Sequence, residues 1–148
     1  GTTAAVVVYC IANLPAPRYL WSAETAARDE IDQFLRQEAS IGEQWSALVA
    51  RGNQRELSFE ELATRLDADI ATRYERSFDA LARLSVSPEM PSAATIRLLR
   101  GYADIRREES HLLAEGLRSG NSKQLGKARE LGKQAEQLAR QIGTAGRP

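Results

Sequence analysis

Four stretches of apolar residues recur at intervals of three and four positions, and this pattern constrains the fold more than any other feature of the chain. Such spacing places the apolar side chains on one face of an α-helix. The four stripes comprise Ile31, Phe34, Leu35, Ile41, Trp45, Leu48 and Val49; Leu62, Leu66, Ile70, Tyr74, Phe78, Leu81 and Leu84; Leu98, Tyr102, Ile105, Leu112 and Leu113; and Leu125, Ala128, Leu131, Ala135, Leu138, Ala139 and Ile142. The pattern predicts four amphipathic helices whose apolar faces form a common core.

Capping and turn signals separate the four predicted helices. Gly52 ends the first, because glycine at a helix C-terminus tolerates a left-handed backbone. Ser58 and Glu61 have the spacing of a capping box at the start of the second helix. Ser92 follows a turn with two prolines and is the expected N-cap of the third helix, which ends at the Ser-Gly pair before Asn121. Asn121 is the expected N-cap of the fourth.

Matching helix lengths and short turns predict an all-α, antiparallel up-down-up-down four-helix bundle. Three segments have about 27 residues and the fourth slightly fewer, so each spans on the order of 40 Å at about 1.5 Å per residue. Residues 22–51 carry six acids and three bases, whereas residues 122–147 carry six bases and two acids. This charge difference predicts that the first and last helices lie side by side. Small residues line the last helix and should allow close packing: Gly126, Ala128, Gly132, Ala135 and Ala139.

The N-terminal segment has a different character from the bundle. Residues 4–12 form an uninterrupted apolar run, which two prolines at 15 and 17 then break. A bilayer requires roughly 20 apolar residues, so this run is either the end of a transmembrane helix or a short strand or segment that covers the bundle. Arg18, Tyr19 and Trp21 follow it and are residue types typical of a membrane–water interface. The absence of a basic cluster there favours the extracytoplasmic side.

The sequence therefore divides into three parts: an apolar N-terminal segment at residues 1–20, a four-helix bundle at residues 21–143 and a loose tail at residues 144–148. Twenty basic and 20 acidic residues cancel, so the charge excess with which proteins neutralise nucleic-acid phosphates is missing. We expect no nucleic-acid partner. The single cysteine, Cys10, cannot form an intramolecular disulfide and does not indicate a redox compartment.

One short motif resembles part of a metal site. Glu108 and His111 form a Glu-x-x-His pattern, which is half of a ferritin-like di-iron site, but that site needs the motif twice and the chain has one histidine. A haem-attachment Cys-x-x-Cys-His, a Gly-x-Ser-x-Gly turn, a glycine-rich phosphate loop and a base beside Cys10 are also missing. We expect no catalytic, cofactor-binding or metal-binding residue here, and any catalytic part would lie outside this chain.

The aromatic residues of the stripes have two interpretations. They either line a ligand pocket between helices or form ordinary core, and their helical spacing favours core: Phe34, Trp45, Tyr74, Phe78 and Tyr102.

Glu109 is predicted to lie at the centre of the third apolar stripe, where an unpaired carboxylate would be costly. Arg106 on the same helix and Arg73 on the preceding helix are the two candidate partners.

The order of these signals resembles a known class of domain. An apolar N-terminal stretch, an aromatic residue before the first helix, the capped start at residues 57–62, a Pro-x-x-Pro turn, and Ser-Gly-Asn before Leu125-x-x-Ala128 resemble membrane-tethered helical-bundle domains of bacterial envelope proteins. The chain is also similar to soluble tails of multi-pass proteins such as rhomboid-type intramembrane proteases, whose catalytic serine and histidine lie in the membrane part. The resemblance implies a location in the cell envelope, tethered and extracytoplasmic; the alternative is cytoplasmic.

We therefore expect a non-catalytic domain that acts in protein interaction or sensing, on a protein partner or on its own membrane region. The alternative is a small-molecule-binding bundle with a pocket between helices. The partner, the ligand and the oligomeric state remain open at this stage.

Overall fold

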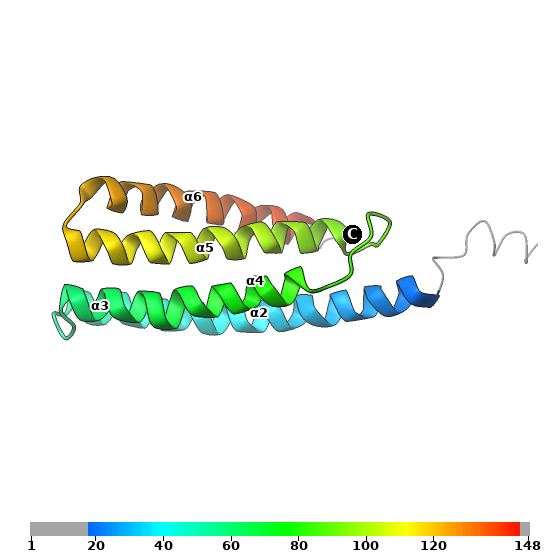
Figure 1. Cartoon of the computed structure of the whole chain (residues 1–148), viewed down its shortest axis with the longest axis horizontal. Coiled ribbons are helices and arrows are strands. Elements are labelled where there is room, and N and C mark those ends of the chain that lie inside the picture. The colour runs from blue at the N-terminus through cyan, green and yellow to red at the C-terminus, as the bar shows by residue number, and fades with distance from the viewer. Residues whose placement is uncertain (1–17, 146–148) are drawn as a thin grey trace, which may run out of the picture.

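The computed structural model describes residues 18–145, which are helical apart from short connections (Figure 1). The helices are α2 (Arg18–Asn53), α3 (Phe59–Arg65), a π-helical turn η1 (Leu66–Ala71), α4 (Thr72–Ala82), α5 (Ala93–Ser119) and α6 (Ser122–Ala145). α3, η1 and α4 follow one another without a break and form one rod. The structure thus confirms the all-α class and the packing of four helices, with no strand in the part it describes.

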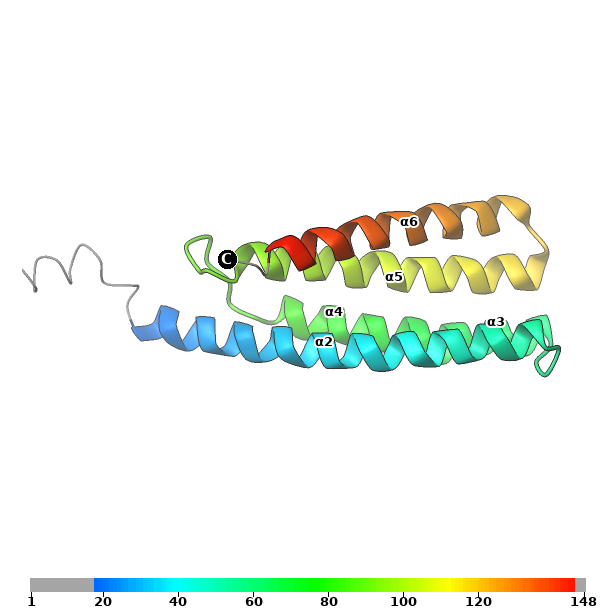
Figure 2. The ribbon, with the colours of Figure 1, turned by 180° about the vertical axis from the view of Figure 1, so that it is seen from behind.

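Successive rods run in opposite directions along the long axis of the molecule, as Figures 1 and 2 both show. α5 packs against α6 on one side and against the α3–η1–α4 rod on the other, while α2 packs mainly against that rod. In Figure 2, α2 and α6 both lie on the near side of the molecule.

In α2 and the second rod most buried apolar residues belong to the predicted stripes, although Leu35 is 48% exposed. The stripe predicted for α5 is largely wrong, because only Tyr102 of it is buried while Ile96, Leu99 and Ala103 of that helix complete the core. The largest fully buried apolar side chains of the core come from α2, the second rod and α5: Ile41, Leu66, Ile70, Tyr74, Leu81, Ile96 and Leu99. Burial of each such side chain contributes about 1.5–3 kcal/mol relative to exposure, so these contacts are the main stabilising force of the bundle.

Two of the predicted helix starts have the expected caps. Ser58 Oγ accepts a hydrogen bond from the Glu61 amide at 3.0 Å, and the Ser58 amide donates to Glu61 Oε1 at 3.3 Å, which completes the capping box. Asn121 Oδ1 accepts from the Lys123 amide at 2.9 Å at the start of α6. Gly120 adopts the left-handed conformation at the end of α5, with φ of 67°.

Ser92 is the N-cap residue of α5, as predicted, but its backbone is helical and its side chain makes no cap hydrogen bond. Instead the Ser92 amide and hydroxyl donate to Glu24 at 2.9 and 2.6 Å, so a carboxylate from α2 caps the N-terminus of α5. This contact depends on tertiary packing, which is why the local sequence did not indicate it.

The predicted close pairing of the first and last helices is also wrong. Within the described part of the chain, no Cα atom of α2 lies within 8 Å of one in α6. Small residues draw α6 onto α5 instead: a Cβ on Gly116 would lie 2.7 Å from Leu125 Cδ2, and one on Gly132 would lie 2.8 Å from Glu109 Oε2. The prediction that small residues permit close approach holds, but their partner is α5.

The N-terminal boundary shifts as well. α2 begins at Arg18, so residues 18–20 belong to the first helix rather than to the apolar segment. The apolar run at residues 4–12, with Cys10, and the last three residues of the predicted tail lie outside the described residues. Across residues 18–145, the helices are too polar or too short to span a bilayer.

Candidate functional site

A network of polar side chains connects α2 with α5 in the middle of the bundle. The Tyr102 hydroxyl donates a short hydrogen bond to Glu38 Oε1 of α2 and accepts one from Arg106 Nε at 3.1 Å. Arg106 Nη1 in turn donates to Glu109 Oε1 at 2.7 Å. Arg106 also lies over the rings of Trp45 and Tyr102, at 5.8 and 5.3 Å from their centroids. The Arg106 guanidinium thus contacts one carboxylate and two aromatic rings, and the Tyr102 hydroxyl connects it to the carboxylate of Glu38.

Glu38 is the least satisfied member of this network. Its Oε2 atom is buried and has no hydrogen-bond partner within the described structure. Burial raises the pKa of Glu38, although Tyr102, Tyr74 and Arg106 each favour its charged form. The same environment, burial first and Glu38 second, raises the pKa of Tyr102 to about 12. The network therefore keeps Tyr102 neutral, and burial makes the charged form of Glu38 unfavourable in the folded state.

Of the two partners predicted for Glu109, the structure confirms Arg106. Glu109 pairs with Arg106, and the two side chains are only 15% and 20% exposed. Burial raises the pKa of Glu109, an effect that Arg106 opposes and that the nearby carboxylates of Glu136 and Glu38 strengthen. Arg73, the alternative partner, contacts other residues.

The aromatic residues pack as core, as the sequence favoured. Phe34 meets Tyr102 edge to face at a centroid separation of 6.2 Å, and Tyr74 meets both Tyr102 and Trp45 at 6.3 Å. Phe34, Tyr74 and Tyr102 are buried, while Trp45 and Phe78 are half-buried. These edge-to-face pairs contribute about 0.5–1.5 kcal/mol each beyond their burial.

A groove of about 380 Å³ runs between α2 and α4, and two arginines line it. The Arg73 guanidinium donates to Gln44 at 2.8 Å, to Gln37 at 2.9 Å and to Ser40 at 3.0 Å. All three acceptors are neutral. Neither Arg73 nor Arg76 forms an ion pair within the described residues, and the wall of the groove also contains Glu30, Gln33, Phe34, Ser77 and Ala80. The groove thus contains two arginines and one acid, Glu30, with Phe34 and Ala80 as its apolar lining residues.

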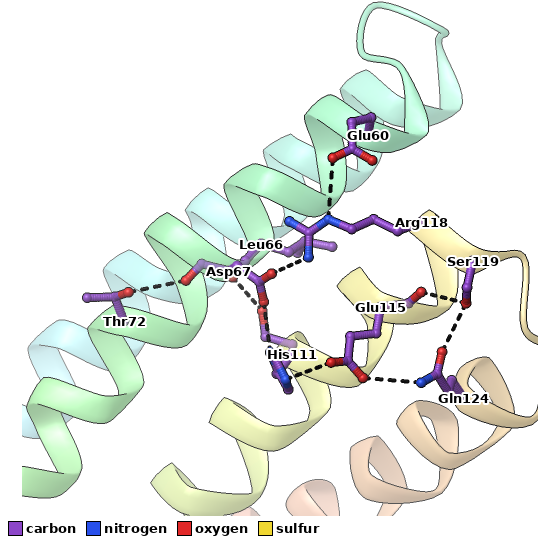
Figure 3. Close-up of polar contacts among 10 residues, drawn as sticks. Glu60, Leu66, Asp67, Thr72, His111, Glu115, Arg118, Ser119 and Gln124 are labelled. Carbon is purple, nitrogen blue, oxygen red and sulfur yellow. Dashed lines mark hydrogen bonds and ion pairs between the residues drawn. The ribbon is translucent and has the colours of Figure 1, made fainter.

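A second polar cluster joins η1 to the end of α5 (Figure 3). Asp67 accepts from Arg118 Nη1 at 2.5 Å and lies 3.1 Å from His111 Nδ1. The other ring nitrogen of His111 lies 3.1 Å from Glu115, which also accepts a bond from Gln124 at 3.1 Å. These side chains are partly exposed and connect two rods at the surface, where water screens the attraction between their charges.

The Glu-x-x-His motif does not form a site of its own. Glu108 is exposed, and His111 uses both ring nitrogens toward carboxylates on opposite sides of the ring. Among residues 18–145, no group of three His, Cys, Asp or Glu side chains converges on a point where one metal ion would sit.

Sequence reasoning missed Glu38 and considered Arg73 only as a partner of Glu109, whereas Arg73 bonds to residues of α2. Glu38 follows Phe34 by four residues, so it lies on the buried face of α2, and that position was a signal for a buried acid. Arg73 precedes the buried Tyr74 and gives no comparable signal, because its partners lie on another helix.

The chain matches no protein-family model and shows no significant similarity to a curated protein or to a solved structure.

Proposed function

We propose that this chain is a non-catalytic helical-bundle domain of a membrane-tethered bacterial protein, and that it acts in protein interaction or sensing on the extracytoplasmic side. The observation that carries the proposal is the side of the bundle where α2 and α6 stand apart. α2 exposes two large apolar side chains, Trp21 at 49% and Leu35 at 48%, and Leu35 lies on the flank of α2 that faces away from α4. Covering these side chains with a partner protein would remove apolar surface from water, which is favourable.

The buried polar groups support a scaffold role. Glu24 caps α5, Ser110 bonds to the Leu66 carbonyl at 2.8 Å and Arg100 bonds to the Leu81 carbonyl at 2.6 Å. Each of these contacts joins two helical rods. Hydrogen bonds between the rods fix the arrangement of the outer faces of the bundle, and a fixed surface can bind a partner protein with little rearrangement.

In-cell photo-crosslinking tests this proposal. The full-length protein should be found in the membrane fraction, and a benzophenone amino acid in place of Leu35 should crosslink it to a protein. The matched control carries the same group in place of Glu108, an exposed position on α5. Equal crosslinking from both positions, or none from Leu35, would refute the proposal.

A small-molecule-binding function is the second candidate, and the groove between α2 and α4 favours it. Arg73 is held in place by neutral acceptors, so its charge remains available to a carboxylate ligand whose apolar part would contact Phe34. Benzoate and succinate are suitable probes in a calorimetric titration. Binding should disappear in the Arg73→Gln variant and persist in Arg97→Gln, which alters an exposed arginine of α5.

A further inference from the structure

The face between α2 and α6 carries complementary charges on its two helices. Gln37 and Gln44 of α2 contact α4, and Glu38 contacts α5, so the opposite flank of α2, with Leu35, is the one beside α6. At about 100° per residue, Asp32 and Glu43 lie about 60° and 80° around α2 from Leu35, on the exposed side of this flank that faces away from the core.

On α6, Gly132 faces Glu109 of α5, and Arg129 and Lys133 lie on the flank beyond it, toward α2. Asp32, Glu43 and Arg129 form no ion pair within the described residues, and Lys133 pairs only with exposed Glu130 on its own helix, at 3.4 Å.

Contacts through α5 fix the relative level of these residues along the bundle. Tyr102 touches both Phe34 and Glu38, so residue 102 is level with residues 34–38 of α2. α2 and α5 run in the same direction (Figure 2), which places residue 109 level with residues 41–45. Glu109 in turn faces Gly132. Glu43 is therefore level with Gly132 and Lys133, although α2 and α6 are too far apart to contact each other.

We propose that this face binds a second copy of the chain about a two-fold axis parallel to the helices. Rotation by 180° about such an axis places α2 of each copy over α6 of the other, at the same level and antiparallel. Glu43 then faces Lys133 and Arg129 of the second copy, twice over. A two-fold axis perpendicular to the helices would instead place α2 on α2 and bring like charges together, which is unfavourable.

The proposed dimer deepens the interaction role and rests on that proposed function. An axis parallel to the helices brings the starts of both α2 helices to the same end of the assembly, as two chains held in one membrane require. Water screens exposed ion pairs, so the charges determine orientation while burial of Leu35 and its neighbours contributes most of the affinity.

Charge reversal with mixing tests the dimer in solution. We expect the wild-type chain to dimerise in sedimentation equilibrium with a dissociation constant of about 100 µM or lower. Reversal of α2 (Glu43→Lys) and reversal of α6 (Arg129→Glu with Lys133→Glu) should each weaken self-association at least tenfold. Mixing the two variants should restore dimers, because α2 of each then meets an oppositely charged α6.

The control reverses two exposed arginines elsewhere, Arg83→Glu with Arg97→Glu, and should dimerise like the wild type. Circular dichroism confirms that each variant is folded, and restoration on mixing excludes misfolding as the cause of the loss. A monomeric wild type, or variants that dimerise alone or fail to pair on mixing, would overturn the proposed dimer. In that event, a crosslink from Leu35 to a different protein would preserve the interaction role, whereas the absence of any crosslink would remove both.

Discussion

Arg55 occupies a backbone conformation that normally requires glycine. Its φ is +60°, and the loop after α2 has the two hydrogen bonds of a Schellman motif, from the Glu56 amide to the Arg51 carbonyl at 2.9 Å and from the Arg55 amide to the Gly52 carbonyl at 3.1 Å. An L-residue in the left-handed region costs about 1 kcal/mol or more relative to glycine. The sequence placed the helix stop at Gly52, three residues before the position with this backbone.

Arg55→Gly should therefore stabilise the domain by about 0.5–1 kcal/mol, as measured by urea unfolding, because it relieves this backbone penalty. The control is Gln54→Gly at the preceding residue, which does not have a positive φ. That substitution should be neutral or destabilising. Equal effects at both positions would mean that the Schellman geometry is incorrect.

Removal of Glu109 should be less costly than its burial alone suggests. An arginine left unpaired in a protein interior costs about 3–5 kcal/mol. Arg106, however, would keep its bond to the Tyr102 hydroxyl and its contacts with two rings. We expect Glu109→Ala to lower the free energy of unfolding by about 1–3 kcal/mol, and Glu109→Gln, which can still accept from Arg106, by less. A larger loss in the Gln variant would contradict this account.

At the level of helices, the π-helical turn explains an unusual spacing in the second stripe. Leu62, Leu66, Ile70, Tyr74 and Phe78 follow one another at intervals of four, whereas a regular α-helix has 3.6 residues per turn. The stripe would therefore drift around a straight helix by about 40° per step. The wider turn at Leu66–Ala71 absorbs the extra residue and returns the stripe to the core. The sequence thus contained a signal for this turn that the helix prediction did not use.

The turn is fixed by hydroxyl groups. Ser110, which is fully buried in α5, donates to the Leu66 carbonyl at 2.8 Å, and Thr72 donates to the Asp67 carbonyl at 3.2 Å. A π-turn interrupts the regular hydrogen-bond ladder of the helix, so carbonyl groups there can accept from side chains. The same turn holds Asp67 against His111 and Arg118 of α5 (Figure 3).

Deletion of Ala68, an exposed residue inside this turn, should yield a folded protein with a regular helix. Both flanks keep their register because the deletion removes the one extra residue. Deletion of Asp79 from α4 is the control and should abolish cooperative unfolding, since the rest of the helix then rotates by about 100°. Ser110→Ala should cost about 1–3 kcal/mol in the wild type and clearly less in the Ala68 deletion. An equal loss of stability in the wild type and in the Ala68 deletion would show that Ser110 does not stabilise the π-helical turn.

How far the sequence predicts this structure depends on the range of each interaction. The helical segments, the capping box at Ser58 and the cap at Asn121 are local, and they were predicted correctly. The pairing of α6 with α5 depends on which helix accepts its small residues, and periodicity does not contain that information. The contacts of Glu24 with Ser92 and of Arg73 with α2 depend on the relative register of helices far apart in sequence. Contacts of this kind, between helices far apart in sequence, determine the groove between α2 and α4 and the face between α2 and α6.

For the whole molecule, buried carboxyl groups couple stability to pH in two opposing directions. Burial acts to raise the pKa of Glu24, but hydrogen bonds from Ser92 and Arg28 outweigh it, so this pKa lies below the usual value of 4.5. The pKa values of Glu38 and Glu109 lie above the same reference value because burial dominates. The folded state therefore favours the charge on Glu24 and disfavours the charges on Glu38 and Glu109.

The sign of each contribution follows from proton linkage. The stability that Glu24 contributes is present above pH 4.5 and is lost as the pH falls through its lowered folded-state pKa. The stability associated with protonated Glu38 and Glu109 is present below pH 4.5 and is lost as the pH rises through their raised values. The thermal midpoint should therefore have its maximum in mildly acidic solution and decline toward both lower and neutral pH.

Glu38→Gln should raise the midpoint at neutral pH and flatten the neutral limb, because it removes a charge that the fold disfavours while Tyr102 keeps an acceptor. Glu24→Gln should lower the midpoint at neutral pH and flatten the acid limb instead. Calorimetric melts of the three proteins from pH 3 to pH 8 would check both limbs, and a neutral limb that is unchanged in Glu38→Gln would show that this carboxyl group is solvated rather than buried.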